Sequence, residues 1–432
     1  MTVTTVALHH VTNPLRSLVR PDLPGRFNEL DVLRRHWPLF SATLDGTVVP
    51  PYEVLIHPSS RCNLRCSWCI GDHVPIELWN EEDRELAVLD AAKSACEVLP
   101  DHLACPDNML KVVEGIVNYR MVAPYREGGA EHKTEFRVHN VSFSGLIGEP
   151  LVAKRALLPA MRFLVDHGLR VGLFTNGVLM DDEVAETLLH IGYVHLSLDA
   201  ATPGSYARVK FGGRSAGEQR FRAAVGNLRR LVERRRETGS GLEVNASFVL
   251  YPETFHELYD AAVLLKGIGV DTLRLKQDIS NDRPLEPNDI PVVAEMIDRI
   301  ENELVDDSFR LLTIHQLAHP EDMVRRFSTC SITNLMAAIG SDGCLYPCNY
   351  HPRPGGWSYG SAIENSFQAV WEGSRRLELR GQLPGICPKV CDPFKNRSNR
   401  LLARARDVAA IEGIDGLERN IGELLDARAY SF

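Results

Sequence analysis

The hydrophobic and polar positions of this chain repeat in two alternating patterns from about residue 53 onward. Short runs rich in β-branched and apolar residues are separated by longer stretches in which apolar residues recur at helical spacing. This alternation is typical of βα units with a parallel sheet, so the sequence predicts an α/β fold. We expect strands at 53–57, 137–143, 170–175, 194–198, 243–250 and 272–276, and helices at 152–166, 181–191, 218–238, 252–267 and 291–304.

The length of 432 residues suits one large domain and a smaller one. Residues 1–50 are rich in Pro, Arg and Leu without clear periodicity, and we expect them to form an N-terminal extension that packs across the main domain. The βα units would occupy 51–305, a small cysteine-rich domain 306–400, and a helical tail 401–432.

The charge and the apolar stretches exclude several classes of partner. The formal net charge of -9 leaves no basic stripe for nucleic acid, and the densest basic run, 229–236, is interrupted by Glu233 as on a solvated helix face. No apolar stretch approaches the length of a membrane span, and the N-terminus lacks the pattern of a secretory signal. We therefore expect a cytoplasmic protein without a nucleic-acid or membrane partner. The ten cysteines then indicate metal ligands or reactive thiols rather than disulfides.

Three of these cysteines stand close together just after the first predicted strand. Cys62, Cys66 and Cys69 have the spacing C-x3-C-x2-C. Three thiolates on one loop can hold three corners of a cubane iron-sulfur cluster, and because no fourth cysteine follows nearby, one iron keeps an open coordination position. A zinc site or a ferredoxin-like electron carrier is the alternative.

Polar residues also follow later predicted strands. Gly148 lets the backbone approach a ligand closely, and the carboxylate of Glu149 can accept hydrogen bonds from an ammonium group. A plain strand-to-helix turn would explain this pair equally. Asn176 stands in a flexible turn after 170–175. Ser197 and Asp199, two residues apart in an extended segment, can bind a vicinal diol, unless Asp199 caps the next helix.

These motifs, in this order, resemble those of the radical S-adenosylmethionine (radical SAM) enzymes over roughly residues 53–280. The resemblance implies a partial (β/α)6 barrel of the TIM type, with the functional residues at the carboxyl ends of the strands. It also implies that S-adenosylmethionine chelates the open iron of a 4Fe-4S cluster. The cofactor-binding residues would be Gly148 and Glu149 for the amino group, Ser197 and Asp199 for the ribose, Trp68 for the adenine unless it packs in the core, and Asn176 at the barrel mouth. The chain departs from the family's Gly-Gly-Glu motif, because two residues separate Gly145 from Gly148.

Five more cysteines lie in the last quarter of the chain. Their arrangement is similar to the cysteine-rich extension of a subset of radical SAM enzymes, called SPASM in its long form and twitch in its short form. The resemblance implies a second 4Fe-4S cluster, with a structural zinc ion as the alternative. The ligands would be Cys330, Cys348, Cys387 and Cys391. Cys344 is then left over as a spare thiol, a substitute ligand or a hydrogen-atom donor.

The resemblance further implies a 5'-deoxyadenosyl radical that abstracts a hydrogen atom from the substrate, with flavodoxin or ferredoxin as electron donor. Return of a hydrogen atom by a thiol gives epimerisation, for which Cys344 is the candidate catalytic residue, whereas oxidation by the second cluster gives dehydrogenation. Small twitch-bearing members act on sugars and aminocyclitols in antibiotic assembly, and residues 1–50 are too few for a peptide-recognition domain. We therefore expect a carbohydrate-like substrate. A peptide-modifying radical SAM enzyme and a non-catalytic iron-sulfur or zinc protein are the alternatives. Cys96 and Cys105 are expected to be packed residues rather than ligands.

Overall fold

The structure is a computed structural model of the chain and describes residues 15, 29–69, 99–145, 148–278, 283–313, 325, 327–352, 356–387, 391 and 393–429. Cys96 lies outside these residues. No helix in the described ranges is long and apolar enough to cross a membrane.

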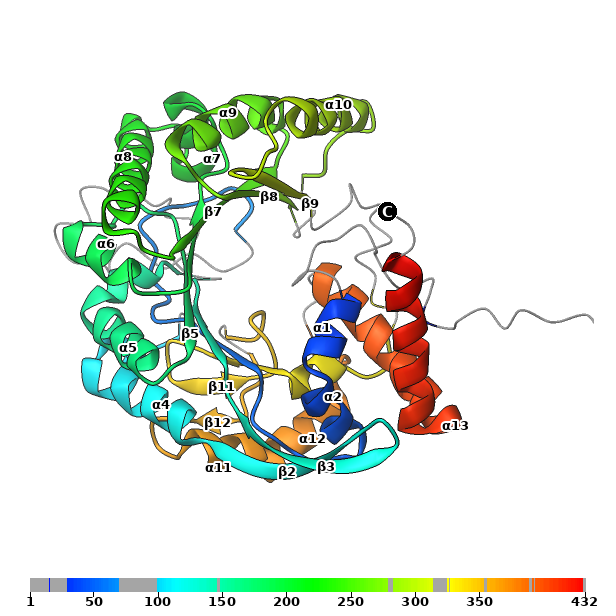
Figure 1. Cartoon of the computed structure of the whole chain (residues 1–432). Helices are drawn as coiled ribbons and strands as arrows, with labels where there is room; N and C mark the ends of the chain where they lie inside the picture. The colour runs from blue at the N-terminus through cyan, green and yellow to red at the C-terminus, as the bar shows by residue number, and fades with distance from the viewer. Residues whose placement is uncertain are drawn as a thin grey trace, which may run out of the picture.

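A curved ten-stranded sheet organises the molecule (Figure 1). Seven neighbouring strands pair in parallel in the order β1, β4, β5, β6, β7, β8 and β9. The curvature and parallel pairing confirm the predicted α/β partial barrel. The bounds of these strands are β1 (Glu53–Ile56), β4 (Asn140–Phe143), β5 (Arg170–Thr175), β6 (Tyr193–Ser197), β7 (Glu243–Leu250), β8 (Thr272–Gln277) and β9 (Arg310–Thr313).

Amphipathic helices cover the outer face of this sheet (Figure 1). Apolar residues of strands and helices form one continuous core between them, which includes Val54 and Ile56 of β1. The alternating side chains of β1 then face the inside of the barrel. The outer helices are α4 (Pro106–Asn118), α5 (Lys154–Asp166), α6 (Asp182–Leu188), α7 (Pro203–Phe211), α8 (Ser215–Thr238), α9 (Leu258–Ile268) and α10 (Asp289–Glu303).

The cysteine-rich region extends the same sheet. β10 (Met336–Ile339) pairs in parallel with β1, on the side opposite β4. β11 (Cys344–Tyr346) and β12 (Gly360–Ser361) then pair in antiparallel fashion. The helices that follow are α11 (Phe367–Glu372), α12 (Ser374–Gln382) and α13 (Pro393–Ala429), the last of which has non-helical backbone at Gly413.

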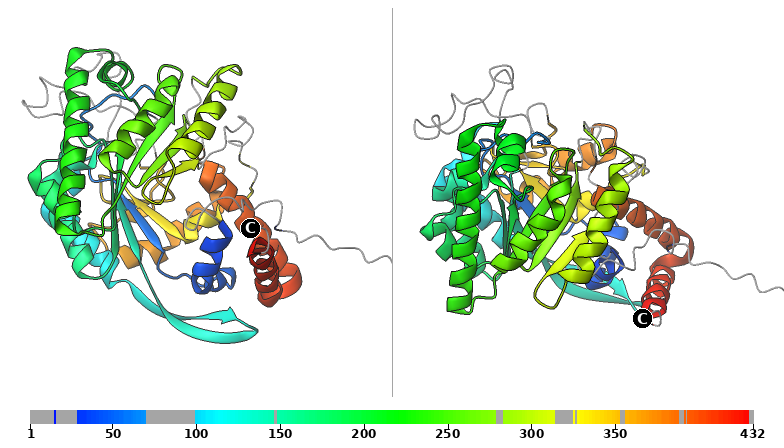
Figure 2. Two further views of the ribbon diagram at one scale, coloured as in Figure 1. Left: turned by 45° about the horizontal axis from the view of Figure 1, so that its top comes forward. Right: turned by 90° about the horizontal axis from the view of Figure 1, so that it is seen from above.

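The N-terminal helices α1 (Glu29–Arg35) and α2 (Trp37–Leu44) form a second apolar cluster with α13. The two views of Figure 2 show these three helices together at one side of the barrel. Both β9, which pairs with β8 in the barrel sheet, and the beginning of α13 at Pro393 fall within residues 306–400, the range expected for the cysteine-rich domain.

The strand expected at 137–143 begins later than predicted. Arg137 ends β3 (Ala130–Arg137), which pairs with β2 (Arg120–Glu127) in a separate two-stranded ribbon. The barrel strand β4 starts only at Asn140. The alternating pattern runs through the corner between the two strands, so the pattern alone did not separate them.

Candidate functional site

The first cysteine group lies on the loop that leaves the carboxyl end of β1. Its beginning is held by Asp101, whose carboxylate accepts hydrogen bonds from the Ser59 hydroxyl at 2.7 Å and the Ser60 backbone at 2.8 Å. Asp101 also forms an ion pair with Arg61 at 2.7 Å. The residue before the first cysteine is therefore anchored on three sides.

The far part of the loop is held by the end of α7. The backbone N–H groups of Arg65 and Ser67 donate to the carbonyl oxygens of Lys210 at 2.9 Å and Val209 at 2.8 Å. Cys62, Cys66 and Cys69 lie between or beside these anchors and are all partly exposed. Burial, followed by the charge of Cys66, raises the pKa of the Cys62 thiol well above its usual value. Three sulfur donors from one loop fit the cluster that the sequence implies.

Gly148 and Glu149 contact the backbone of the same loop. The Glu149 N–H donates to the carbonyl oxygen of Arg61 at 2.8 Å. A Cβ atom on Gly148 would stand 2.0 Å from the carbonyl oxygen of Ser59, so only glycine fits here. Gly145 is required for a local reason, because its Cβ would lie 1.6 Å from the carbonyl oxygen of Gly148.

The carboxylate of Glu149 is buried and accepts three hydrogen bonds. The donors are the Leu151 N–H at 3.1 Å, the Thr175 hydroxyl at 2.6 Å and the Asn176 N–H at 2.8 Å. Burial raises the pKa of Glu149, and these hydrogen bonds oppose the shift. A carboxylate has about four acceptor positions, so one remains for a further donor such as an ammonium group.

Asn176 connects the end of β5 to the cysteine loop. Its side-chain amide donates to the Asn63 side-chain oxygen at 2.6 Å. The Asn63 amide nitrogen is buried and has no hydrogen-bond partner. An unpaired buried donor beside Cys62 is costly in the absence of a ligand, which indicates that a bound group completes this site.

Ser197 and Asp199 were expected to share one side of an extended segment, but the backbone is not extended at Asp199. Asp199 has a positive φ of 60°, which turns its side chain inward. Its carboxylate accepts from the Val249 N–H at 2.9 Å and pairs with Lys210 at 2.6 Å, where both side chains are almost fully buried. Ser197 is only partly buried, and its carbonyl oxygen accepts from the Lys210 ammonium at 2.6 Å. A ribose hydroxyl that contacts Asp199 would share its carboxylate with the Val249 N–H and the Lys210 ammonium.

Lys210 is the residue of this site that the sequence analysis missed. Its ammonium lies 5.8 Å from the centre of the Trp68 ring and 5.4 Å from that of Tyr206. Burial raises the pKa of Cys66 to about 12, although the Lys210 charge acts in the opposite direction. Lys210 lies four residues after Tyr206 in α7, a helix that was not among those expected from the sequence.

Trp68 packs beside the end of β7. Its ring centre is 5.0 Å from that of Tyr251, and the planes are tilted by 57°. Trp68 is partly exposed. An aromatic ring in this position can stack on a flat ligand.

One member of the second cysteine group, Cys330, contacts α13. Burial, followed by the charges of Cys348 and Cys330, raises the pKa of Cys387 to about 12. The side chain of Asn399 donates to the Cys330 sulfur at 3.4 Å. Cys391 is partly buried. Residues 388–390 and 392, on either side of it in the sequence, lie outside the described ranges.

Cys344 lies apart from this group. Burial and then Asp342 raise the pKa of its thiol to about 12, with Glu364 also contributing. Its backbone N–H donates to the carboxylate of Asp342 at 3.1 Å. Because Ala338 pairs with Tyr346, alternation along β11 places Cys344 on the sheet face that β1 turns toward the inside of the barrel. Cys105 was expected to be packed, but it is exposed at the start of α4.

Neither cysteine group is arranged around a single ion. In the described ranges, no three His, Cys, Asp or Glu side chains converge closely enough to hold one metal ion. An iron-sulfur cluster distributes its protein ligands over several iron atoms and does not need such convergence.

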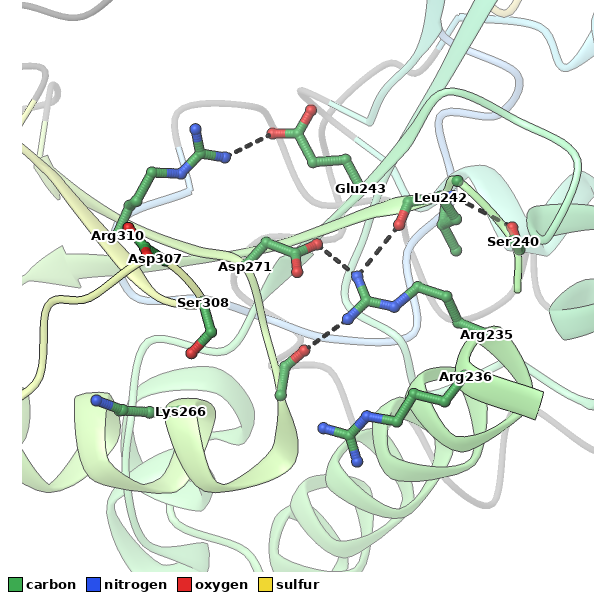
Figure 3. Close-up of a pocket in the computed structure, with 12 residues that line it drawn as sticks. Arg235, Arg236, Ser240, Leu242, Glu243, Lys266, Asp271, Asp307, Ser308 and Arg310 are labelled. Carbon is green, nitrogen blue, oxygen red and sulfur yellow. Dashed lines mark hydrogen bonds and ion pairs between the residues drawn. The ribbon is translucent and has the colours of Figure 1, made fainter. Parts of the chain in front are cut away.

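A cavity of about 600 Å³ lies at the opposite, amino ends of β7 to β9 (Figure 3). Two ion pairs line it: Arg235 pairs with Asp271 at 2.5 Å, and Arg310 lies 3.8 Å from Glu243. This cavity lies at the opposite ends of the strands from the cysteine loop and Glu149 and is not the candidate site.

No family model matches the sequence. A protein of Pyrococcus furiosus described as a tungsten-containing aldehyde ferredoxin oxidoreductase cofactor-modifying protein is 27% identical in an alignment of 343 residues that covers 74% of this chain and 81% of the relative. SuiB of Streptococcus suis bound to the precursor peptide SuiA has a TM-score of 0.51 at 15% identity, with 84% of this chain and 72% of SuiB covered. SuiB bound to S-adenosylmethionine has a TM-score of 0.50 at 15% identity, with 79% and 67% covered. The chain thus has the fold of the radical SAM enzymes, the family that its motifs resemble.

Proposed function

We propose that this chain is a radical SAM enzyme whose first 4Fe-4S cluster is held by Cys62, Cys66 and Cys69. The observation that carries this proposal is the anchored loop at the carboxyl end of β1, with the unpaired amide of Asn63 beside it. When bound, such a cluster supplies the electron that cleaves S-adenosylmethionine to the 5'-deoxyadenosyl radical.

The side chains around the loop would bind and orient the cofactor. Glu149 has one acceptor position left for the amino group of the methionyl part, and Asn176 keeps the Asn63 amide in place. The partly buried Ser197 would contact the ribose, with Asp199 as its neighbour. The partly exposed ring of Trp68 would pack against the adenine.

Cys330, Cys348, Cys387 and Cys391 would hold a second 4Fe-4S cluster. Their number and their resemblance to the cysteine-rich extension support this assignment. The hydrogen bond from Asn399 to the Cys330 sulfur is of the kind that tunes a metal ligand.

A peptide is the substrate class that the comparisons favour. SuiB, which shares this fold, was crystallised with a precursor peptide, and the relative from Pyrococcus furiosus is described as cofactor-modifying. Neither description names a sugar, so the expected sugar- or aminocyclitol-like substrate has no support from these relatives. We therefore propose modification of a peptide substrate by the radical, in place of the carbohydrate reaction expected from the sequence.

Cys344 remains a candidate hydrogen-atom donor. Its raised pKa keeps the sulfur protonated at neutral pH, as a hydrogen-atom donor must be, and it faces the inside of the barrel. Epimerisation would use this thiol, whereas dehydrogenation would not. We propose flavodoxin or ferredoxin as the electron donor, since both reactions need a reduced first cluster. We also propose a cytoplasmic location.

The class is tested by anaerobic reconstitution, followed by incubation with S-adenosylmethionine and dithionite. We expect 5'-deoxyadenosine from the wild type and none from Cys62→Ala, while Cys105→Ala, which removes an exposed thiol outside both groups, behaves as the wild type. Unchanged 5'-deoxyadenosine formation in Cys62→Ala would refute the assignment of the first cluster.

The substrate class is tested by adding short peptides or sugars and measuring 5'-deoxyadenosine formation and deuterium transfer from labelled substrate. Faster formation with peptides alone supports the proposal, and faster formation with sugars alone overturns it. In the same assay, Cys344→Ser should retain both clusters and lose deuterium incorporation from heavy water into product, if Cys344 is the donor.

A further inference from the structure

Arg376 of α12 is a buried cation with unused hydrogen-bond donors. Its side chain is 1% exposed. One guanidinium nitrogen donates to the carbonyl oxygen of Thr333 at 3.1 Å and the side chain of Asn334 at 3.4 Å. The guanidinium carbon lies 3.7 Å from the centre of the Trp371 ring. The Nε and Nη1 atoms are buried and have no partner, which is costly for a charged group.

A second arginine stands beside it. Arg380 is one helical turn further along α12, on the same face, and its buried Nε atom also has no partner. Burial and then the charge of Arg380 lower the pKa of Arg376 to about 10. Within the described ranges neither arginine forms an ion pair. Two like charges are therefore held together without a carboxylate between them.

The two arginines lie behind the turn that carries Cys330. Thr333 and Asn334, which Arg376 contacts, belong to the short helix that directly follows this cysteine. Burial raises the pKa of Tyr359, the charges of Arg376 and Arg380 oppose this shift, and those of Cys330 and Cys348 add to it. The Tyr359 hydroxyl is also buried without a partner. The hydrogen bonds of Arg376 to Thr333 and Asn334 thus connect the arginine pair to the segment that carries Cys330.

An iron-sulfur cluster with four thiolate ligands carries net negative charge, which increases when the cluster is reduced. Nearby buried cations stabilise the more negative state more strongly. We propose that Arg376 and Arg380 are positioning residues of the second cysteine group, supplying the positive charge that faces its cluster and raises its reduction potential. This inference rests on the second cluster assigned under the proposed function.

The inference gives the second cluster the role of electron acceptor. A cluster whose reduced state is stabilised by buried positive charge accepts an electron more readily than the same cluster without that charge. A structural zinc ion would make no use of this charge difference, because zinc has no redox chemistry.

The test measures the potential of the second cluster by itself. The combined Cys62→Ala, Cys66→Ala and Cys69→Ala background removes the first group, so that iron and sulfide analysis and an electron paramagnetic resonance titration with dithionite report only the second. In this background, Arg376→Gln and Arg380→Gln each remove one charge, and Arg376→Lys keeps the charge without the planar fork. Arg375→Gln is the matched control, because Arg375 is an exposed neighbour paired with Glu378 at 2.9 Å.

We expect each Gln variant to make reduction about tenfold less favourable, which is a shift of about 59 mV for a one-electron couple. Arg376→Lys should shift less, and Arg375→Gln not measurably. A potential that is unchanged in both Gln variants with full iron content overturns the proposal. Iron-free or zinc-loaded background protein also overturns it, whereas formation of 5'-deoxyadenosine by the wild type tests the proposed function separately. Arg380, which is only partly buried, keeps the test decisive if Arg376→Gln fails to fold.

Discussion

The buried ion pair between Lys210 and Asp199 allows a quantitative prediction. Replacing Lys210 with Met keeps the length and apolar character of the side chain but removes the ammonium. Asp199 then retains only the Val249 N–H as a donor, and the Ser197 carbonyl oxygen loses its partner. Because both partners of the pair are almost fully buried, water cannot replace the lost ammonium.

Removal of one partner of a buried ion pair typically costs about 3–5 kcal/mol. We expect a loss in this range for Lys210→Met. Addition of Asp199→Asn removes the uncompensated charge, and asparagine tolerates the positive φ at this position. The double variant should therefore be more stable than the sum of the single effects by at least about 1.5 kcal/mol.

The measurement is urea unfolding of the iron-free, thiol-reduced protein, with circular dichroism and tryptophan fluorescence as probes. Lys266→Met is the control, because Lys266 forms a pair of similar length with Asp306, at 2.6 Å, in a more exposed place. Its loss should cost no more than about 1 kcal/mol. A cost below about 1 kcal/mol for Lys210→Met, or additive single and double effects, would refute the reasoning.

Three further predictions concern the loop, pH and iron. Gly148→Ala places a Cβ 2.0 Å from a backbone oxygen. Calorimetry should therefore show destabilisation of about 1–3 kcal/mol, and iron content should fall. In the control Gly226→Ala the new Cβ has no atom within 4 Å, so this variant should be more stable than the wild type by about 0.5–1 kcal/mol. Burial, together with Lys395, lowers the pKa of His57 from 6.5 to about 4. The unfolded state then binds more protons, so the free energy of unfolding should fall by up to about 3 kcal/mol as pH drops from 6.5 to 4, and His57→Gln should flatten this slope in urea titrations. Removal of iron with a chelator should lower the melting temperature of the wild type, since a ligand of the folded state stabilises it; equal melting temperatures with and without iron would count against both clusters.

The parallel strands were predictable because they are buried on both faces and bounded by turns. The ranges 170–175 and 243–250 match β5 and β7. The β2–β3 ribbon was missed because many of its side chains are exposed, so it lacks an apolar strand pattern. Its available signal was Gly128-Gly129, where both residues have positive φ, as in a tight hairpin turn.

The candidate site was predictable at the level of motifs, not of side-chain partners. The cysteine loop and Glu149 could be placed by their positions after strands. The pairing of Ser197 with Asp199 assumed extended backbone, which the left-handed conformation of Asp199 interrupts. Lys210 and Arg376 could not be assigned, because no helix was expected at α7 or α12 and the sequence does not show which charge or ring lies opposite each side chain.

The position of β1 between β4 and β10 has a practical consequence for dissecting this protein. A shortened chain that ends before Met336 would leave the backbone groups of Glu53–Ile56 without their partner on one side, and such a bare strand edge invites aggregation. Separate expression of the two halves should therefore yield insoluble material, and individual cysteine substitutions in the intact chain are the sounder way to tell the two metal groups apart.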